Sequence, residues 1–216
     1  MTRFVLVRHG ETEWNREEVF RGRADIPLNE RGRAQAEAVA RALAGVPLQA
    51  VYSSPLSRAL ETARALGRPH GLEVRVHPGL VDLDYGAWQG RPHAEVRRLY
   101  PRLYRRWLER PETVRFPGGE SLREAARRAL AAVQELARAH PAGPDEGWVA
   151  LVAHRVINKL LVCELLGVGP GGFWKVGQDT AALNVFDYGP EGSVVRVIND
   201  TCHLGRNPAG PPERDF

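Results

Sequence analysis

Histidines and arginines follow three apolar runs of the sequence, close to the point where each run ends. Arg8 and His9 directly follow the first run, and His154 directly follows a later one. Arg58 stands one turn into the helix expected after a third run. Ligands of open parallel sheets bind beyond the carboxyl ends of the strands. If these three runs are neighbouring parallel strands, two imidazoles and two guanidiniums therefore meet at one edge of the sheet.

This set of side chains is suited to a phosphate dianion. Arg8 and Arg58 can each offer paired N–H donors to phosphoryl oxygens. A neutral histidine can attack phosphorus and form a phosphohistidine, which divides one hard displacement into two easier ones. The second histidine can donate to an oxygen whose charge must be held in the transition state. Taken singly, His154 could be a core histidine and Arg58 a solvated charge, so the hypothesis depends on their joint position.

The elements that must position these residues can be read along the chain. Short apolar or alternating runs predict strands over residues 4–7, 49–52, 73–76, 149–153, 183–188 and 194–198. Periodic apolar residues and capping signals predict helices between Asn29 and Gly45, from Pro55 to Gly67, on either side of Pro101 within residues 92–110, after Ser121, and over about residues 156–166. Residues 141–147 are predicted to form a loop.

Strands that alternate with helices predict an α/β fold. We expect three layers, with a largely parallel central sheet and helices on both of its faces. No break between independently packed halves is visible, so residues 1–216 are expected to form one domain. A loose tail is expected from about residue 207, where Pro and Gly become frequent.

Composition limits the class of protein. The chain has 216 residues, 43% apolar and 26% charged, which fits a soluble globular protein. No apolar run approaches the roughly 18–20 residues of a membrane span, and the N-terminus lacks a secretory apolar segment. The two cysteines, Cys163 and Cys202, have no metal-binding spacing, so a cytoplasmic protein with reduced thiols is predicted. The net charge of +4 is too small to argue for a nucleic-acid partner.

The stretch LVRHGETEWN, from Leu6 to Asn15, strongly resembles the signature of the histidine phosphatase superfamily, the phosphoglycerate-mutase-like phosphatases. The resemblance covers roughly residues 3–205 and implies the phosphoglycerate-mutase-like version of the α/β/α fold. Further matching motifs lie in residues 20–22, 25–29, 53–63, 82–90, 117–121 and 152–154.

The resemblance implies a role for each residue of the cluster. His9 is the nucleophile that becomes phosphorylated. The phosphoryl group is held by side chains that donate hydrogen bonds, namely Arg8, Asn15, Arg58 and His154. No metal ion and no cofactor are implied, because the arginines and histidines supply the positive charge.

The general acid implied by the resemblance is Asp82, four residues before the Gly of the Tyr-Gly-x-Trp motif. The family usually has Glu at that position, so this chain carries a side chain that is one methylene shorter. Asp84, two residues on, is the rival candidate. A carboxylic acid in this role must have a pKa raised by burial or by a neighbouring negative charge.

Other departures from the family pattern bear on the substrate. Arg155 and Asn158 stand where many relatives have Gly and Arg, and Arg21 stands where relatives often carry a neutral residue. Arg21 can add a cation at the rim of the pocket and so favour a substrate with a carboxylate or a second phosphate. The alternative is a surface arginine with no such role.

Three functions remain open. In a phosphomonoesterase, water attacks the phosphohistidine; in a 2,3-bisphosphoglycerate-dependent phosphoglycerate mutase, the phosphoryl group returns to the substrate; a non-catalytic protein would only bind phospho-ligands. The mutases carry an extra covering segment, whereas residues 87–120 here run directly from one motif to the next, as in the phosphatases. Easier access of water to the intermediate favours hydrolysis.

The C-terminal part bears on the choice of phosphoester. Residues 173–179 and 199–205 are similar to those of the metal-independent phosphoserine phosphatases, in which the tail helps to select the substrate. Phosphoserine is therefore the leading single substrate, with His203 as a candidate reader of its carboxylate, although Tyr85 stands where those enzymes tend to have His. Phosphoglycerate-type esters and α-ribazole phosphate are the alternatives. The resemblance also makes a homodimer one expectation.

Overall fold

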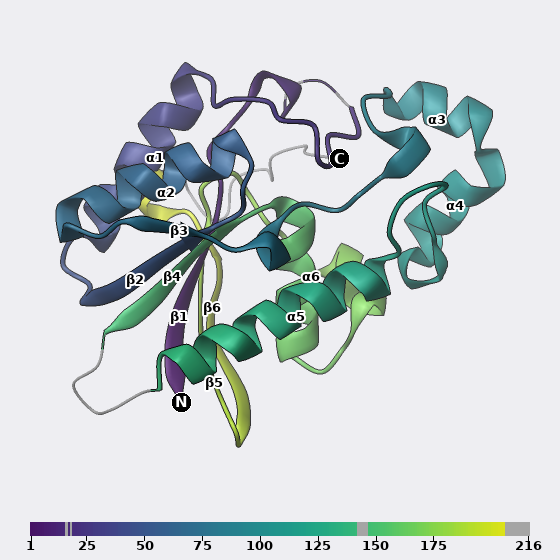
Figure 1. The fold of residues 1–216 in the computed structure, drawn as a ribbon. Coiled ribbons are helices and arrows are strands. Elements are labelled where there is room, and N and C mark those ends of the chain that lie inside the picture. Colours follow the sequence, from purple (N-terminus) through teal and green to yellow (C-terminus); the bar gives the residue numbers. More distant parts are fainter. Residues whose placement is uncertain (16, 18, 142–146, 206–216) are drawn as a thin grey trace.

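A central sheet organises the computed structural model, which describes residues 1–15, 17, 19–141 and 147–205. In this part of the chain six strands form one sheet (Figure 1). The first four strands in that sheet are parallel, and the last two are antiparallel to their neighbours. From edge to edge the strands are β3 (Val74–Val76), β2 (Leu48–Ser53), β4 (Trp148–Ala153), β1 (Thr2–Arg8), β5 (Leu183–Gly189) and β6 (Gly192–Asp200).

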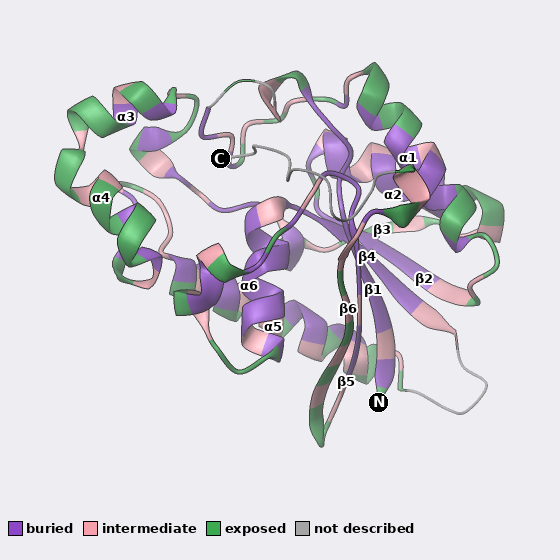
Figure 2. Ribbon diagram, turned by 180° about the vertical axis from the view of Figure 1, so that it is seen from behind, coloured by how far each residue is buried: buried purple, intermediate pink, exposed green. Residues whose placement is uncertain are grey.

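Helices cover both faces of the sheet, so the predicted three layers and largely parallel sheet are confirmed (Figure 1). On one face α1 (Glu30–Leu43) and α2 (Ser57–Gly67) share a core with alternate residues of β1. On the other face α5 (Leu122–Ala139) and α6 (Arg155–Leu165) share a core with Phe4 and Leu6 of β1. Successive side chains of a strand point to opposite faces, so one apolar strand supplies both cores. The central strands are accordingly almost wholly buried (Figure 2).

Local sequence signals account for several element boundaries. Asn29 caps α1, with its side chain accepting from the amide of Gly32, and Ser121 with Glu124 forms a capping box at the start of α5. The helix expected from Pro55 begins instead at Ser57, because Leu56 is extended and serves as the cap residue. The pair of helices around Pro101 is α3 (His93–Leu99) and α4 (Pro101–Glu109).

Two predictions fall wholly or partly outside the described residues. The loop expected over 141–147 is described only at its ends, and the tail expected from about residue 207 lies beyond residue 205. Within the described part of the chain, no helix has both the length and the apolar character needed to cross a bilayer.

Two glycines allow the loop after β1 to pack against the first turn of α1. A Cβ on Gly32 would lie 2.0 Å from the carbonyl oxygen of Glu11, and a Cβ on Gly10 would lie 2.3 Å from the carbonyl oxygen of Gly32. Side chains reinforce the contact, because Asn29 Nδ2 donates to Glu11 Oε1 at 2.9 Å. The position of the loop that begins with His9 therefore depends on close backbone approach to α1.

Replacing Gly32 by Ala is expected to destabilise the protein by about 2 kcal/mol or more, because the added methyl group would overlap the backbone of Glu11. Gly45→Ala is the matched control, since a Cβ at Gly45 would meet no atom within 4 Å. Denaturant unfolding of both variants measures the difference. Equal stability of the two variants would contradict the close approach.

Candidate active site

The carboxyl ends of three neighbouring parallel strands bring the predicted cluster together. β4 lies between β1 and β2, with Arg8 level with Ala153 and Ser53 level with Val152. The predicted residues at these strand ends are all buried: Arg8 is the last residue of β1, His9 and His154 directly follow β1 and β4, and Arg58 lies in the first turn of α2. The imidazole rings of His9 and His154 have centroids 5.1 Å apart.

His9 is held as a neutral imidazole with one defined tautomer. Its Nδ1 lies 2.7 Å from the carbonyl oxygen of Gly10, which can only accept, so Nδ1 carries the hydrogen. The lone pair therefore belongs to Nε2, which accepts from Arg58 Nε at 3.3 Å. Burial, and then the charges of Arg58 and Arg8, lower the pKa of His9 well below its ordinary value. This environment favours an unprotonated Nε2 with a cation beside it, which is the state that a nucleophilic imidazole needs.

His154 complements His9 from the end of β4. Its Nε2 lies 2.7 Å from Ser54 Oγ, and its Nδ1 lies 3.8 Å from Asp82 Oδ2 without a hydrogen-bond partner among the described residues. Burial, followed by the charge of Arg58, also lowers the pKa of His154 well below its ordinary value. If the hydroxyl of Ser54 donates to Nε2, the hydrogen of the neutral ring is on Nδ1. His154 can then donate to an oxygen placed between it and Asp82.

The two guanidiniums are fixed by backbone carbonyls. Arg58 donates from Nη1 to Ala24 O at 2.7 Å and from Nη2 to Gly22 O at 2.8 Å. Arg8 donates from Nη1 to Gln178 O at 2.7 Å. A buried guanidinium that is held in this way presents a fixed charge and fixed donors, which suits the recognition of a phosphoryl group.

Asp82 is the carboxylate that reaches this cluster. Its Oδ2 lies 3.4 Å from Arg58 Nη2, and its Oδ1 accepts from the amide of Leu83 at 2.9 Å. Burial raises the pKa of Asp82 although Arg58 and the Leu83 amide act in the opposite direction. Asp84 is directed elsewhere, because its Oδ1 accepts from the Gly86 amide at 2.8 Å and its Oδ2 lies 3.5 Å from Arg23 Nη1. The geometry thus separates the two candidate acids.

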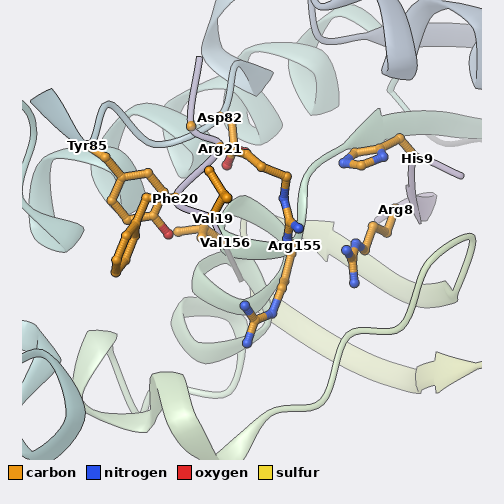
Figure 3. A pocket seen from close by; sticks show the side chains of 10 residues that line it. Arg8, His9, Val19, Phe20, Arg21, Asp82, Tyr85, Arg155 and Val156 are labelled. Atoms are coloured by element: carbon orange, nitrogen blue, oxygen red, sulfur yellow. The ribbon is translucent and has the colours of Figure 1, made fainter. Parts of the chain in front are cut away.

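A pocket opens beside these groups, and Arg21 and Arg155 also line it (Figure 3). In this view the side chains of Arg21 and Arg155 lie between Tyr85 on one side and Arg8 with His9 on the other. Arg21 donates from Nη1 to Trp14 O at 2.6 Å. The described residues that line the pocket are Arg8, His9, Val19, Phe20, Arg21, Gly22, Asp82, Tyr85, Arg155 and Val156.

Four predicted site residues are not among the residues that line this pocket. Arg58 and His154 lie directly behind the lining, against His9 and Asp82, whereas Asn15 and His203 make other contacts. Asn15 Oδ1 accepts from both the amide and the hydroxyl of Thr12, at 2.8 Å each, which ties the loop after β1 together. His203, in the short 3-10 helix Cys202–Leu204, lines a separate groove beside Arg31 and Gln35 of α1. The structure therefore does not bring His203 to the pocket wall.

The sequence reasoning missed several residues that support the site. Ser54 orients His154, Gln178 anchors Arg8, and Arg128 holds the loop that carries Asp82. Ser54 lies two residues after the predicted strand 49–52 and could have been found. Arg128 lies in the helix predicted after Ser121, where an arginine is usually a solvated charge. Among the residues that the structure describes, no three His, Cys, Asp or Glu side chains are grouped to hold a metal ion.

Comparison with known proteins gives consistent matches over most of the chain. Residues 4–201 match the family model described as histidine phosphatase superfamily (branch 1). Phosphoserine phosphatase 1 of Hydrogenobacter thermophilus is 37% identical over 208 residues, which are 95% of each chain. A 2,3-bisphosphoglycerate-dependent phosphoglycerate mutase 2 of Gloeobacter violaceus is 32% identical over 221 residues, 100% of this chain and 99% of that one. The native structure of a mycobacterial glucosyl-3-phosphoglycerate phosphatase superposes with a TM-score of 0.85 and 33% identity, over 93% of this chain and 99% of that one.

We expect His9 to be neutral and protonated on Nδ1 at neutral pH, because a carbonyl faces Nδ1 and two buried arginines disfavour the imidazolium. Nitrogen NMR of protein labelled with ¹⁵N-histidine measures both the tautomer and the titration. The His9→Asn variant identifies the signal. A resonance that converts to the imidazolium near the ordinary histidine pKa of about 6.5 would contradict this environment.

Proposed function

The chain belongs to the histidine phosphatase superfamily, branch 1, and from this premise we propose that it hydrolyses small anionic phosphate monoesters through a phosphohistidine formed on His9. The observation that carries the proposal is the unprotonated Nε2 of His9, placed at 3.3 Å from Arg58 in a pocket that Arg8 also lines. The proposal requires no metal ion and no cofactor, since guanidiniums supply the positive charge.

The reaction takes two displacements. In the first, His9 Nε2 forms a bond to phosphorus while the bond to the ester oxygen breaks, and the leaving alkoxide takes a proton from Asp82. In the second, water attacks phosphorus and gives a proton to the Asp82 carboxylate, and the bond between nitrogen and phosphorus breaks. Inorganic phosphate leaves and His9 returns to its first state.

The remaining residues of the cluster hold the phosphoryl oxygens. Arg8 and Arg58 neutralise the dianion, and His154 donates from Nδ1 to an oxygen whose charge must be held. Asn15 is included from the family resemblance. Its Oδ1 accepts from Thr12, and the role proposed for it requires Nδ2 to donate to the phosphoryl group.

The substrate favoured by the pocket carries a second anionic group, and phosphoserine is the leading single choice. Arg21 and Arg155 both line the pocket, and a relative named phosphoserine phosphatase is 37% identical. Equal losses of kcat/KM on phosphoserine and on phosphoethanolamine, which lacks the carboxylate, in an Arg21→Gln variant would remove this role from Arg21. His203 lies outside the described pocket wall, so it could read the carboxylate of phosphoserine only if the substrate also contacted the C-terminal segment.

Phosphoglycerate mutase activity is the second candidate, because a relative with that name matches the whole chain at 32% identity. Both activities share the phosphohistidine and differ in whether water or a second substrate takes the phosphoryl group. Phosphate release measures hydrolysis, whereas interconversion of 2- and 3-phosphoglycerate in the presence of 2,3-bisphosphoglycerate measures mutase activity, so the two assays together separate the candidates.

Replacing His9 by Ala is expected to lower phosphate release from phosphomonoesters by at least about a thousandfold, because the nucleophile is lost. Release is measured over a panel with phosphoserine, phosphoglycerates and α-ribazole phosphate. Brief incubation with ³²P-labelled substrate should label the wild-type protein with an acid-labile, alkali-stable phosphoryl group. Turnover that survives in His9→Ala would sink the proposed mechanism.

Asp82→Asn is expected to lower kcat/KM for alkyl phosphates by about a hundredfold or more, because an alkoxide needs a proton as it leaves. The loss on p-nitrophenyl phosphate should be under about tenfold, since nitrophenolate is a good leaving group. For alkyl esters, wild-type kcat/KM should fall as pH rises through the raised pKa of Asp82, because only the protonated carboxyl donates. Asp84→Asn is the matched control, and a larger effect there would transfer the role to Asp84.

A further inference from the structure

Asp82 lies in a loop, residues 81–85, that follows the short 3-10 helix Pro78–Leu80. One guanidinium of α5 contacts three carbonyl oxygens of this helix and loop. Arg128 Nη1 donates to Gly79 O and to Val81 O at 2.8 Å each. Arg128 Nη2 lies 3.5 Å from Asp82 O. Carbonyl oxygens in a loop accept no regular hydrogen bonds from a neighbouring strand or helical turn. An arginine has five N–H donors and can therefore bind several such carbonyls at once.

Glu120 fixes the guanidinium from the other side. Arg128 Nε donates to Glu120 Oε1 at 3.1 Å and Nη2 donates to Oε2 at 3.0 Å, a paired contact. Burial alone would raise the pKa of Glu120. This pKa is nevertheless lowered from its ordinary value, mainly by the hydrogen bonds and charge of Arg128 and further by the Asp84 amide and the charge of Arg23. Glu120 is thus an anion that orients Arg128.

The same glutamate ties the far end of the loop. Asp84 N donates to Glu120 Oε2 at 3.1 Å, and Glu120 N donates back to Asp84 O at 2.9 Å. Arg23 adds a partly exposed contact, with Nη2 at 3.1 Å from Glu120 Oε1 and Nε at 3.4 Å from Asp82 O. Backbone contacts therefore hold the loop on both sides of Asp82.

We propose that Arg128 and Glu120 are positioning residues that set the place of the Asp82 carboxylate relative to the leaving group, a proposal that rests on the proposed function. An aspartate has only two side-chain torsions, so its carboxyl follows the backbone closely. Asp82 Oδ2 is 3.4 Å from Arg58 and 3.8 Å from His154, and a small shift of the loop removes it from the reacting oxygen. Misplacement by about 1 Å can cost a hundredfold in rate.

The experiment compares kcat/KM on an alkyl phosphate and on p-nitrophenyl phosphate for Arg128→Met, Arg128→Lys and Glu120→Gln. This parameter covers the steps up to the phosphohistidine, where proton donation is needed only for the alkyl ester. Arg128→Met should lose about tenfold to a hundredfold on the alkyl ester and under about threefold on the aryl ester. Arg128→Lys should recover part of the loss, because an ammonium still reaches one or two carbonyls.

Arg115→Met is the matched control. Arg115 also pairs with a glutamate near the start of α5, Glu124, but it is mostly exposed. Among the described residues, the side-chain hydrogen bonds of this pair are with each other and with Ser121, not with the Asp82 loop. The ratio of the two kcat/KM values should stay at the wild-type level in this variant. Glu120→Gln tests the same loop if Arg128→Met does not fold.

A double variant supplies the second readout. In Asp82→Asn the proton donor is already gone, so adding Arg128→Met should cost no more than about threefold on the alkyl ester. Equal losses on both esters, or a full multiplication of losses in the double variant, would overturn the positioning role. Failure of the wild-type protein to hydrolyse either ester would instead overturn the proposed function, so the two failures are distinguishable.

Discussion

Two guanidiniums buried beside a neutral imidazole form the constraint on which the rest of the site depends. Arg8 and Arg58 are 0% and 1% exposed. A buried charge is tolerated only when it is paired and hydrogen-bonded, and the penalty otherwise is several kcal/mol. The carbonyl oxygens of Gly22, Ala24 and Gln178 accept hydrogen bonds from the two arginines, and the carboxyl group of Asp82 lies beside Arg58. These groups come from separate loops. The hydrogen bonds that stabilise the buried guanidiniums therefore also hold the loops that surround the pocket.

The same burial has opposite effects on the acids and bases it surrounds. Loss of water disfavours the charged form of any group, so it lowers the pKa of His9 and His154 and raises that of Asp82. The nearby arginines add to the effect on the histidines and oppose it on the aspartate. One environment therefore favours a neutral imidazole and a protonated carboxyl in the same pocket, which the two displacements proposed for this site require.

The fold was largely predictable because its signals are local. Apolar runs marked the strands and capping residues marked helix starts, so errors are confined to boundaries such as the start of α2 at Ser57 instead of Pro55. Support for the site was less predictable. Arg128 has the sequence context of a solvated helix residue, yet it binds carbonyls some fifty residues earlier, such as Gly79 at a separation of 49. No spacing rule connects two such positions, because loop paths decide whether they meet.

The sequence alone determined the chemical groups and their place along the chain: an imidazole and a guanidinium at the end of one strand, an imidazole at the end of another, and a short carboxylate where relatives carry a longer one. Tertiary structure decided which of these groups share a pocket. The registers of β1 and β2 with β4 place the strand ends level, and the hydrogen bonds of Arg128 and Glu120 place the Asp82 loop above them. The tertiary structure also seats His203 against α1, outside the described pocket wall. Residue types follow from the chain itself, whereas distances between atoms follow from backbone pairing and loop anchoring across large sequence separations.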